Sequence, residues 1–500
     1  MGQNRRFQTP DTFVIIFFVV LAAAIMTYMI PQGQFEMEEV TYEHGDEEAS
    51  EEVLDAEGYS QVTDDNGEPV RDGISLFEGG GGTGFLNYMF EGLVSGDKWG
   101  SAVGVVAFIL IIGGAFGIIM RTGAVEEGIM KVIQRTQGRD LFLLPVIFFM
   151  FSLGGAVFGM GEEAIAFAMI IIPLVVALGY DAITGVMITY VATQIGFATS
   201  WMNPFGVAIA QGVADVPVLS GAPFRIFMWA FFTLVGIIYT VIYARRIKKD
   251  PTRSLSYETD GYFRENYTKE NISSRFTLGH GLVVASLALG IVWIVWGVVA
   301  HAYYIPEIAT QFFTIGLTAG VIGVVFKLRD MRINDVASSF KEGAQNLLPA
   351  ALIVGMAKGI VIVLGGDDPG SPSVLNTILY HGGQLLDGVP SVVAAWSMFF
   401  FQSVFNFFVV SGSGQAALTM PLLAPLADLA EIPRQIAVLG YQLGDGFTNL
   451  IVPTSAALMG VLGVARIDWI TWLKFQFKFQ LLLFTLASLF IIAAVLLNFS

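Results

Sequence analysis

Two stretches of this chain interrupt apolar helical sequence with glycine, proline and polar residues, and they do so in the same order. The first stretch covers residues 151–211 and the second covers residues 405–462. In hydrocarbon an unpaired backbone group costs several kcal/mol, so a non-helical segment persists there only if protein buries it or a wet cavity borders it. Matched interruptions in two halves of a chain are typical of the binding sites of secondary transporters.

Each stretch contains a glycine-rich tip and, roughly forty residues later, a broken helix. The tips read GMGEE at residues 159–163 and SGSGQ at residues 411–415. The breaks read TSWMNP at residues 199–204 and TNLIVPTS at residues 448–455. We expect the tips to be the turns of two re-entrant hairpins, which occupy residues 141–178 and 390–429.

The composition predicts a polytopic membrane protein, because 54% of the 500 residues are hydrophobic and only 14% are charged. An ordinary soluble enzyme has a lower apolar fraction and about a quarter of charged residues. The chain has no cysteine, which excludes disulfides, thiolate metal sites and cysteine nucleophiles. It also lacks a Walker motif, a Gly-x-Ser-x-Gly elbow and a His-Glu-x-x-His motif, and the four histidines show no ligand spacing. We therefore expect neither an enzyme nor a resident metal or other cofactor.

The net charge of -16 argues against a nucleic-acid partner. Most of this charge lies in one segment of the chain. Residues 36–97 contain eighteen acidic side chains, and the basic residues there are Arg71 and the adjoining Lys98. We interpret residues 32–100 as a solvated extracytoplasmic loop. A region that gathers cations before transport is the second interpretation.

Apolar runs long enough to cross a hydrocarbon core of ~30 Å predict nine crossings, two of them broken. They lie at residues 12–30, 102–120, 182–213, 224–244, 278–300, 308–326, 345–364, 435–463 and 480–497. The first run could also be a cleaved signal peptide, but it continues beyond its small residues 22–24. Residues 467–479 are amphipathic and are expected to lie along the cytoplasmic interface.

Positive charge orients this topology. With two hairpins rather than four further crossings, twenty-one Lys/Arg lie on one side, and Arg71, Lys98, Arg225 and Arg434 lie on the other. Lys358 is then left within the membrane. The positive-inside rule places the N-terminus in the cytoplasm and the C-terminus outside. The hairpins then enter from opposite faces, as an inverted repeat requires.

The repeat extends upstream of the hairpins. Gly113, Gly117 and Gly123 match Gly355, Gly359 and Gly365 at a constant offset of 242 residues. We therefore predict an all-α membrane fold of two inverted repeats, about nine transmembrane helices, two re-entrant hairpins and two broken helices. The first repeat covers residues 1–249, a cytoplasmic linker 250–277, an extra helix 278–307 and the second repeat 308–500.

The second-half sequence NFFVVSGSGQAALTMPLLAPLADL, followed by YQLGDGFTNLIVPTSAALMG, resembles the YfcC family of bacterial inner-membrane carriers. This family is grouped with the anaerobic C4-dicarboxylate carrier and AbgT-like proteins in the ion transporter superfamily. The resemblance covers nearly the whole chain, although the long acidic first loop departs from it. It implies a secondary transporter whose hairpin tips and broken helices meet at the substrate, in the bacterial inner membrane. Some relatives are regarded as arginine/ornithine antiporters, and older family names suggest dicarboxylates.

Ionisable residues at membrane depth are costly and are usually functional. Glu162, Glu163 and Asp445 could form a cation or proton site, or one of them could pair with Lys358 as structural support. Lys358 could instead bind a substrate carboxylate. Neutral hydrogen-bonding groups at the tips and breaks complete the predicted substrate site, although each could equally join helices: Gly161, Thr199, Ser200, Asn203, Asn406, Ser411, Ser413, Gly414, Gln415, Asn449, Thr454 and Ser455.

Three acids against one lysine favour a cationic or zwitterionic solute over a dianion. We therefore expect exchange of a basic amino acid of the arginine/ornithine type, with a Na⁺- or H⁺-coupled dicarboxylate carrier as the alternative. Coupling to Na⁺, near Asn203 and Asn449, or to H⁺ is left open, as is a homodimer. The expected partners are a small-molecule substrate (an amino acid or a carboxylate) and membrane lipid. A gated channel on the same helices is the competing class.

Overall fold

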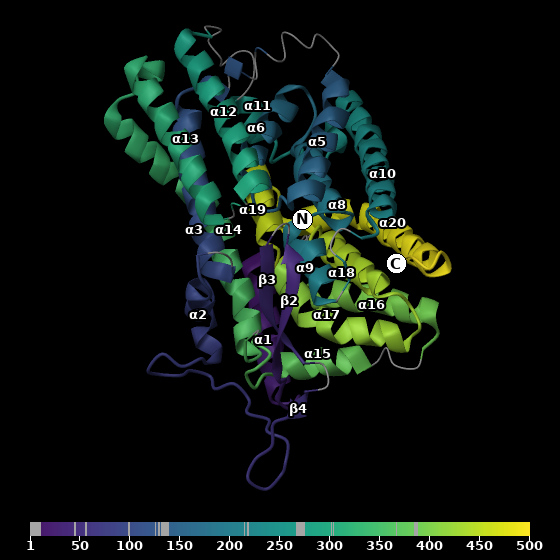
Figure 1. The fold of residues 1–500 in the computed structure, drawn as a ribbon. Helices are drawn as coiled ribbons and strands as arrows, with labels where there is room; N and C mark the ends of the chain where they lie inside the picture. The colour runs from purple at the N-terminus through teal and green to yellow at the C-terminus, as the bar shows by residue number, and fades with distance from the viewer. Residues whose placement is uncertain are drawn as a thin grey trace, which may run out of the picture.

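The structure is a computed structural model built almost entirely of helices (Figure 1). It describes residues 12–44, 47–55, 58–98, 101–125, 127–128, 131, 140–214, 216–217, 220–266, 276–301, 303, 305–366, 368–384 and 389–500. Four of the basic residues that the predicted topology places on the cytoplasmic side lie outside these ranges: Arg5, Arg6, Arg135 and Arg139.

Five described helices are long and apolar enough to cross a membrane by length and composition. They are α3 (Ser101–Arg121), α10 (Ala222–Lys249), α13 (Ile305–Val325), α14 (Ile333–Val363) and α20 (Trp469–Leu496). Two further predicted spans are occupied by the apolar helices α1 (Thr12–Thr27) and α12 (Leu278–His301). The prediction of an all-α polytopic membrane protein is confirmed.

Each predicted hairpin is a pair of helices joined by a short turn. In the first, α5 (Leu143–Phe158) and α6 (Ala164–Ala177) flank residues 159–163. In the second, α16 (Ser391–Phe405) and α17 (Gly412–Leu429) flank residues 406–411. The two hairpins lie in opposite halves of the molecule, the first beside α11 (Gly261–Asn266) and the second toward the acidic strands (Figure 1).

The second tip differs from the predicted one, which was placed at residues 411–415. The Ser411 hydroxyl accepts a hydrogen bond from the Gly414 amide at 3.3 Å and caps α17. Because this cap lets the helix begin at Gly412, residues 412–415 form the first turn of α17 rather than the connecting turn.

Both helices are interrupted where the sequence predicts the breaks. The first comprises α7 (Ala182–Val186), the π-helical segment η3 (Met187–Val191) and α8 (Ala192–Ala198), and it resumes as a second π-helical segment, η4 (Pro204–Ala208), and α9 (Ile209–Val213). The second comprises α18 (Arg434–Thr448) and α19 (Ala456–Ala465). π-Helical turns are rare and occur frequently at functional sites.

Elements of each half of the chain pack against elements of the other half. The second arm of the first hairpin, α6, contacts α19, and the second arm of the other hairpin, α17, contacts α9. The helices before the breaks, α8 and α18, also contact each other, and α3 runs along α14. Each hairpin is therefore supported by the broken helix of the other half, which brings both tips and both breaks to the centre.

One of the glycine pairs found at constant offset occupies equivalent positions in the two halves. Gly123 and Gly365 both follow the last turn of a helix, α3 and α14, in left-handed conformations with φ of 75° and 106°. Glycine adopts this C-terminal conformation without a steric penalty. At Gly117 a Cβ would lie 2.2 Å from the Ser339 carbonyl oxygen, so this glycine lets α3 approach α14 closely.

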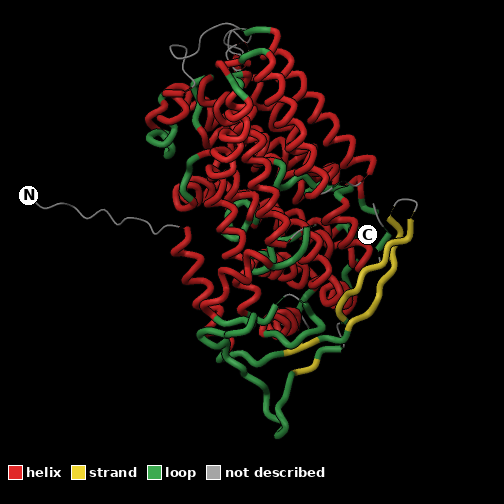
Figure 2. Tube along the Cα trace, turned by 90° about the vertical axis from the view of Figure 1, so that its left-hand side faces the viewer, coloured by secondary structure: helices red, strands yellow, loops and turns green. Residues whose placement is uncertain are grey.

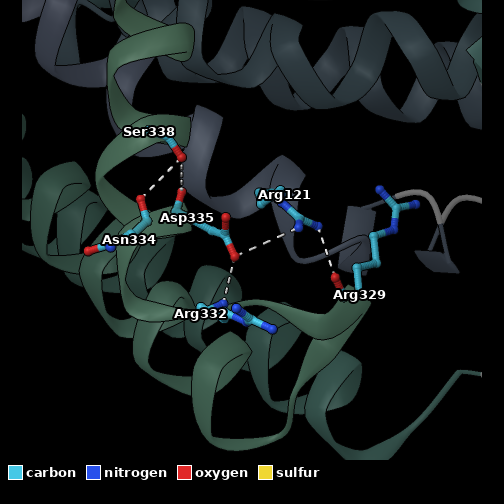
Figure 3. A network of polar contacts seen from close by, with 6 residues as sticks. All are labelled: Arg121, Arg329, Arg332, Asn334, Asp335 and Ser338. Carbon is cyan, nitrogen blue, oxygen red and sulfur yellow. Dashed lines mark hydrogen bonds and ion pairs between the residues drawn. The ribbon is translucent and has the colours of Figure 1, made fainter.

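A polar network fixes the start of α14 against the end of α3 (Figure 3). Arg121 donates to the Arg329 carbonyl oxygen at 3.2 Å and lies 3.9 Å from the Asp335 carboxylate. Asp335 in turn accepts the Arg332 amide at 2.7 Å, which caps α14. Consequently α14 begins at Ile333, well before the predicted residue 345, and continues through Pro349.

Two residues are more deeply buried than the sequence indicates. Within the expected interfacial segment 467–479, most of which belongs to α20, Trp472 is fully buried and donates to the Leu450 carbonyl oxygen at 2.8 Å. Arg225, which the predicted topology assigns to the outer side, is fully buried in the first turn of α10. A hydropathy pattern cannot place such residues, because their environment is set by helices distant in sequence.

The acidic segment contains strands that the sequence did not predict. Strand β2 (Met37–His44) pairs antiparallel with β3 (Glu47–Leu54), and β1 (Gly33–Gln34) pairs with β4 (Ser60–Gln61). The β2–β3 ribbon extends along the outside of the helices, where β2 contacts α9 and β3 contacts α17 (Figure 2). The segment is therefore more than a solvated loop, since part of it lies over the second hairpin.

The linker after α10 docks on the start of the first broken helix. Asp260 is buried and accepts the Ala182 amide at 3.2 Å, and the nearby Asp181 accepts the Ser254 hydroxyl at 2.7 Å. Burial, and then the negative charge of Asp181, raise the pKa of Asp260 to about 7. At the same end Arg466 stacks on the ring of Tyr262 at 3.6 Å, so the linker also contacts the residue that ends α19.

Candidate functional site

A cavity of about 440 Å³ lies where the hairpin tips meet the second break and α14. Ten of the sixteen predicted site residues border it: Gly161, Glu162, Glu163, Lys358, Ser411, Ser413, Gly414, Asn449, Thr454 and Ser455. The other six, which are Thr199, Ser200, Asn203, Asn406, Gln415 and Asp445, do not. The cavity thus collects residues from four elements that are distant in sequence.

The first hairpin tip presents two carboxylates to the cavity. Helix α5 ends at Gly159, whose φ of 69° is the left-handed conformation that glycine favours. Glu162 and Glu163 directly precede α6 and are half-buried. Glu163 accepts the Gly161 amide at 2.9 Å. This position suits negative charge, because the unpaired amides at a helix N-terminus carry partial positive charge.

The second hairpin tip offers the opposite polarity. The first turn of α17 borders the cavity with Ser413 and Gly414, so the N-terminal end of this helix faces the same space as the two glutamates. Tyr441 of α18 donates to the Gly412 carbonyl oxygen at 2.5 Å and fixes this turn. An anionic group in the cavity would meet the positive end of α17 here.

Lys358 of α14 borders the cavity as well, and it is half-buried. Lys358 and the two glutamates therefore border one cavity from different elements of the chain. A solute with both a cation and a carboxylate has a complement for each in this arrangement.

The first break is arranged by hydrogen bonds rather than by exposure to the cavity. Thr199 donates to the Ile195 carbonyl oxygen and Ser200 to the Ala156 carbonyl oxygen of α5, both at 2.6 Å. The Ser200 hydroxyl also accepts the Asn203 amide at 2.8 Å. All three residues are buried; Ser200 joins the break to α5, whereas the Thr199 bond lies within its own helix. Asn203 lies against Gly159, where a Cβ would be 2.3 Å from its Oδ1.

The second break is exposed to the cavity and is held from the other half of the chain. Tyr190 of η3 donates to the Asn449 carbonyl oxygen at 2.8 Å and lies 3.1 Å from the Ser455 hydroxyl. Ser455 caps α19 by accepting the Leu458 amide. The break therefore stays open as a non-helical segment because its backbone groups find partners in the first broken helix.

A buried polar cluster lies behind the second break. Asn449 donates to Asp445 Oδ1 at 3.0 Å, and Asn406 donates to Asn449 Oδ1 at 2.9 Å. Asp445 and Asn406 are fully buried, and neither Asp445 Oδ2 nor Asn406 Oδ1 has a hydrogen-bond partner among the described residues. Buried acceptor oxygens without donors favour a bound cation or a proton in this cluster. Gln415 lies apart from this cluster, bonded to Gln402 at 2.6 Å.

Sequence reasoning missed several residues around the site. Asp97 and Gln194 border the cavity, although Asp97 was assigned to the acidic loop. Tyr190 was not singled out, because one tyrosine within an apolar run gives no signal of its own. Gln194 carried a usable signal, since it is a polar residue five positions before the first break inside an otherwise apolar helix.

The family model of the C4-dicarboxylate anaerobic carriers (DcuC) matches residues 9–496. The chain belongs to this family. It is 51% identical over 498 residues to the "Putative basic amino acid antiporter YfcC" of Escherichia coli (strain K12). This match covers 99% of this chain and 98% of the relative. An uncharacterized protein of Haemophilus influenzae is 29% identical over 500 residues, covering 95% and 94% of the two chains.

Two solved transporter structures also resemble this DcuC-family chain. YdaH of Alcanivorax borkumensis has a TM-score of 0.42 and 16% sequence identity, and the match covers 97% of this chain and 98% of YdaH. MtrF of Neisseria gonorrhoeae has a TM-score of 0.41 and 15% sequence identity, and the match covers 98% of this chain and 96% of MtrF. The resemblance to YfcC drawn from the second-half motif is confirmed by the full-length match. The protein is a multi-pass membrane transporter and not an enzyme.

Proposed function

We propose that this DcuC-family protein exchanges basic amino acids of the arginine/ornithine type across the membrane by alternating access. The observation that carries the proposal is the cavity between the two hairpin tips, bordered by Glu162, Glu163 and Lys358. The name of the Escherichia coli relative supports the same substrate class. Alternating access needs a substrate site between two halves of the chain that pack against each other.

The charges around the cavity match such a solute in orientation. Its side-chain cation would meet Glu162 or Glu163 at the first tip, and its carboxylate would meet Lys358 or the N-terminal turn of α17. The buried Asp445 lies behind the second break and adds negative charge, so a dianion gains less here than a zwitterion with a further positive charge.

The alternative is a Na⁺- or H⁺-coupled dicarboxylate carrier. Lys358 and the positive end of α17 border the same cavity and could hold one carboxylate each. The family description names C4-dicarboxylates. The two proposals differ in the expected role of the glutamates, which bind the cation of an amino acid but would repel a dicarboxylate.

Counterflow in proteoliposomes tests the proposal. Vesicles loaded with unlabelled arginine, ornithine, lysine or succinate are given trace labelled arginine outside. Exchange accelerated by internal ornithine or lysine supports the proposal, and uptake accelerated only by succinate would establish the dicarboxylate alternative. Conductance without counterflow would establish a channel.

Charge-neutralising variants refine the test. Glu163→Gln and Asp445→Asn keep an acceptor oxygen for the Gly161 amide and for Asn449 but remove the charge. We expect both to abolish arginine binding, measured by thermal stabilisation. Ser411→Ala is the control, because it removes only the cap of α17, and it should weaken binding less.

The coupling ion forms part of the proposal. The cluster of Asn406, Asp445 and Asn449 offers oxygens to Na⁺ or a base to H⁺, and Asn203 beside Gly159 is the corresponding position at the first tip. Pure exchange needs neither ion. Uptake of arginine measured with a Na⁺ gradient, with a pH gradient and with neither separates the three cases.

The proposed topology has two inverted repeats, residues 1–249 and 308–500, with a cytoplasmic N-terminus and an extracytoplasmic C-terminus in the bacterial inner membrane. The placement of the two hairpins in opposite halves of the molecule supports it (Figure 1). Because the chain has no cysteine, single cysteines at the outer ends of the hairpins, at the exposed Phe142 before α5 and the exposed Glu431 after α17, can be labelled from either side. Labelling of both positions from the same side would rule out the inversion. Light scattering of the detergent complex tests the homodimer.

A further inference from the structure

Arg225 is a buried cation that the proposed site does not use. It lies in the first turn of α10 with no exposed surface, and its Nε atom has no hydrogen-bond partner among the described residues. No ion pair forms between Arg225 and a carboxylate in the described part of the chain. Burial without a counter-charge and placement at the positive end of a helix are both unfavourable. A residue kept at such a cost within a membrane domain is expected to serve function.

The partners of Arg225 are neutral amides on α18. One guanidinium nitrogen donates to Gln442 Oε1, and the other donates to Gln435 Oε1 at 3.0 Å. Gln435 Oε1 also accepts from Gln211 of α9 at 3.3 Å. Arg225 thus lies between the first half of the chain, which supplies α9 and α10, and the broken helix of the second half.

The bond to Gln442 sets the direction of that amide. A glutamine side chain can present either its oxygen or its NH₂ group to a neighbour. Because Arg225 takes the oxygen, the NH₂ group points the other way and donates to the Ser200 carbonyl oxygen at 2.7 Å, with a longer contact of 3.4 Å to the Phe197 carbonyl. These carbonyls are among those that lose their helical partners at the end of α8.

The Ser200 position reaches the site through short steps. The Ser200 hydroxyl accepts the Asn203 amide at 2.8 Å, and Asn203 lies against Gly159 at the first hairpin tip. Without Arg225 the buried Gln442 Oε1 atom would lose its donor, which is costly. The amide would then rearrange to find another partner, and the break would lose one of its buried caps.

We propose that Arg225 is a positioning residue for transport, which acts through Gln442 to hold the first break at residues 199–203 closed against the first hairpin tip. The effect on substrate affinity rests on the proposed exchange function. The effect on the break itself does not, so the two can be measured apart.

The test that needs no substrate uses cysteine labelling. Thr199 and Thr189 are both fully buried on the first broken helix, and both hydroxyls bond to a backbone carbonyl within the helix. Thr199→Cys reports opening of the break, and Thr189→Cys is the matched reporter away from it. In the purified full-length protein, Arg225→Met should raise the rate at which N-ethylmaleimide labels Thr199→Cys by about tenfold, as expected for loss of a charged hydrogen bond, and leave Thr189→Cys unchanged.

Two further variants keep the test decisive. Gln442→Met should reproduce the effect with Arg225 in place, and it carries the test if Arg225→Met does not fold. The double variant should match either single one, because both break the same chain of contacts. Arg434→Met is the control, since Arg434 also donates to a backbone carbonyl, that of Ala214 at 3.0 Å, but pairs with Asp428. It should not change labelling.

The transport arm measures arginine exchange. Arg225→Met should raise KM by about tenfold and change the maximal rate much less, while Arg434→Met changes neither. Unchanged labelling of Thr199→Cys, equal acceleration of Thr189→Cys, or additive effects in the double variant would overturn the inference. Arginine exchange absent in the unmodified protein, with labelling as expected, would overturn the proposed substrate and leave the role of Arg225 standing.

Discussion

Gly446 lies where the two broken helices cross, and replacing it with alanine tests whether this crossing sets the geometry of both breaks. A Cβ at Gly446 would lie 2.5 Å from the Cβ of Ala198 and 2.6 Å from its Cα. Ala198 ends α8 directly before the first break, and Gly446 precedes the second break by three residues. The obstacle is the backbone of α8, so no flexible side chain can move aside.

The magnitude follows from the contact distances. Carbon atoms at optimal separation are about 3.5–4.0 Å apart, so Gly446→Ala must separate the two helices by about 1 Å. Overpacking of a well-packed core costs about 1–3 kcal/mol. Alanine gains about 1 kcal/mol over glycine in a helix interior. We therefore expect Gly446→Ala to destabilise the protein by up to about 2 kcal/mol, taking the upper end of the overpacking range and subtracting the helix gain.

Gly440→Ala is the matched control in the same helix. Its Cβ would lie 3.3 Å from the Phe399 amide nitrogen, a contact that a shift of a few tenths of an ångström relieves. The helix gain should then make this variant as stable as the unmodified protein or more so. The assay is the fraction of monodisperse protein after heating in detergent, together with arginine counterflow.

Gly446→Ala should lose counterflow at temperatures where it remains folded, because the wedge displaces both breaks from the hairpin tips. Gly440→Ala should exchange normally. If the two variants behaved alike in both assays, the crossing of α8 and α18 would not be what positions the site.

Three further predictions come from other contacts. The raised pKa of Asp260 means that its docked form holds a proton which the undocked linker releases, so docking weakens as pH rises from about 4 to about 7. Protection of residues 250–266 from hydrogen exchange, measured relative to the intrinsic rate at each pH, should decrease over this range, and Asp260→Asn should remove the dependence. Trp472→Phe leaves the buried Leu450 carbonyl without its donor and should lower stability by about 1–3 kcal/mol, measured by thermal unfolding. Tyr190→Phe removes the donor to the second break and should impair arginine exchange more than it lowers stability, whereas equal losses would mark a purely structural bond.

The sequence predicted those parts of the site that follow from local chemistry. A cluster of polar residues with proline inside an apolar run favours a break, so both breaks were found at the correct residues. A proline alone does not suffice, since α14 continues through Pro349. The two glutamates were recognised because charge at membrane depth is costly. Ten of the predicted residues accordingly border one cavity.

The remaining features depend on contacts between distant elements. Nothing in the sequence around Arg225 distinguishes an outward-facing arginine from a buried one, since its partners Gln435 and Gln442 are more than two hundred residues away. Lys358 was expected either to pair with an acid or to bind a substrate carboxylate. The structure places it with Glu162 and Glu163 around one cavity, an arrangement that depends on how α14 meets the first hairpin tip.

The contacts of the two breaks show a reciprocity that bears on how the halves move. The first break is capped by Gln442, which belongs to the second broken helix, and the second break is capped by Tyr190, which belongs to the first. Each non-helical segment therefore depends on the other half of the chain for a donor. Since a buried carbonyl that loses its donor is costly, neither break can rearrange without disturbing the helix that caps the other. Such coupling favours a single concerted transition over independent opening of two gates, which is the behaviour that alternating access requires of a carrier.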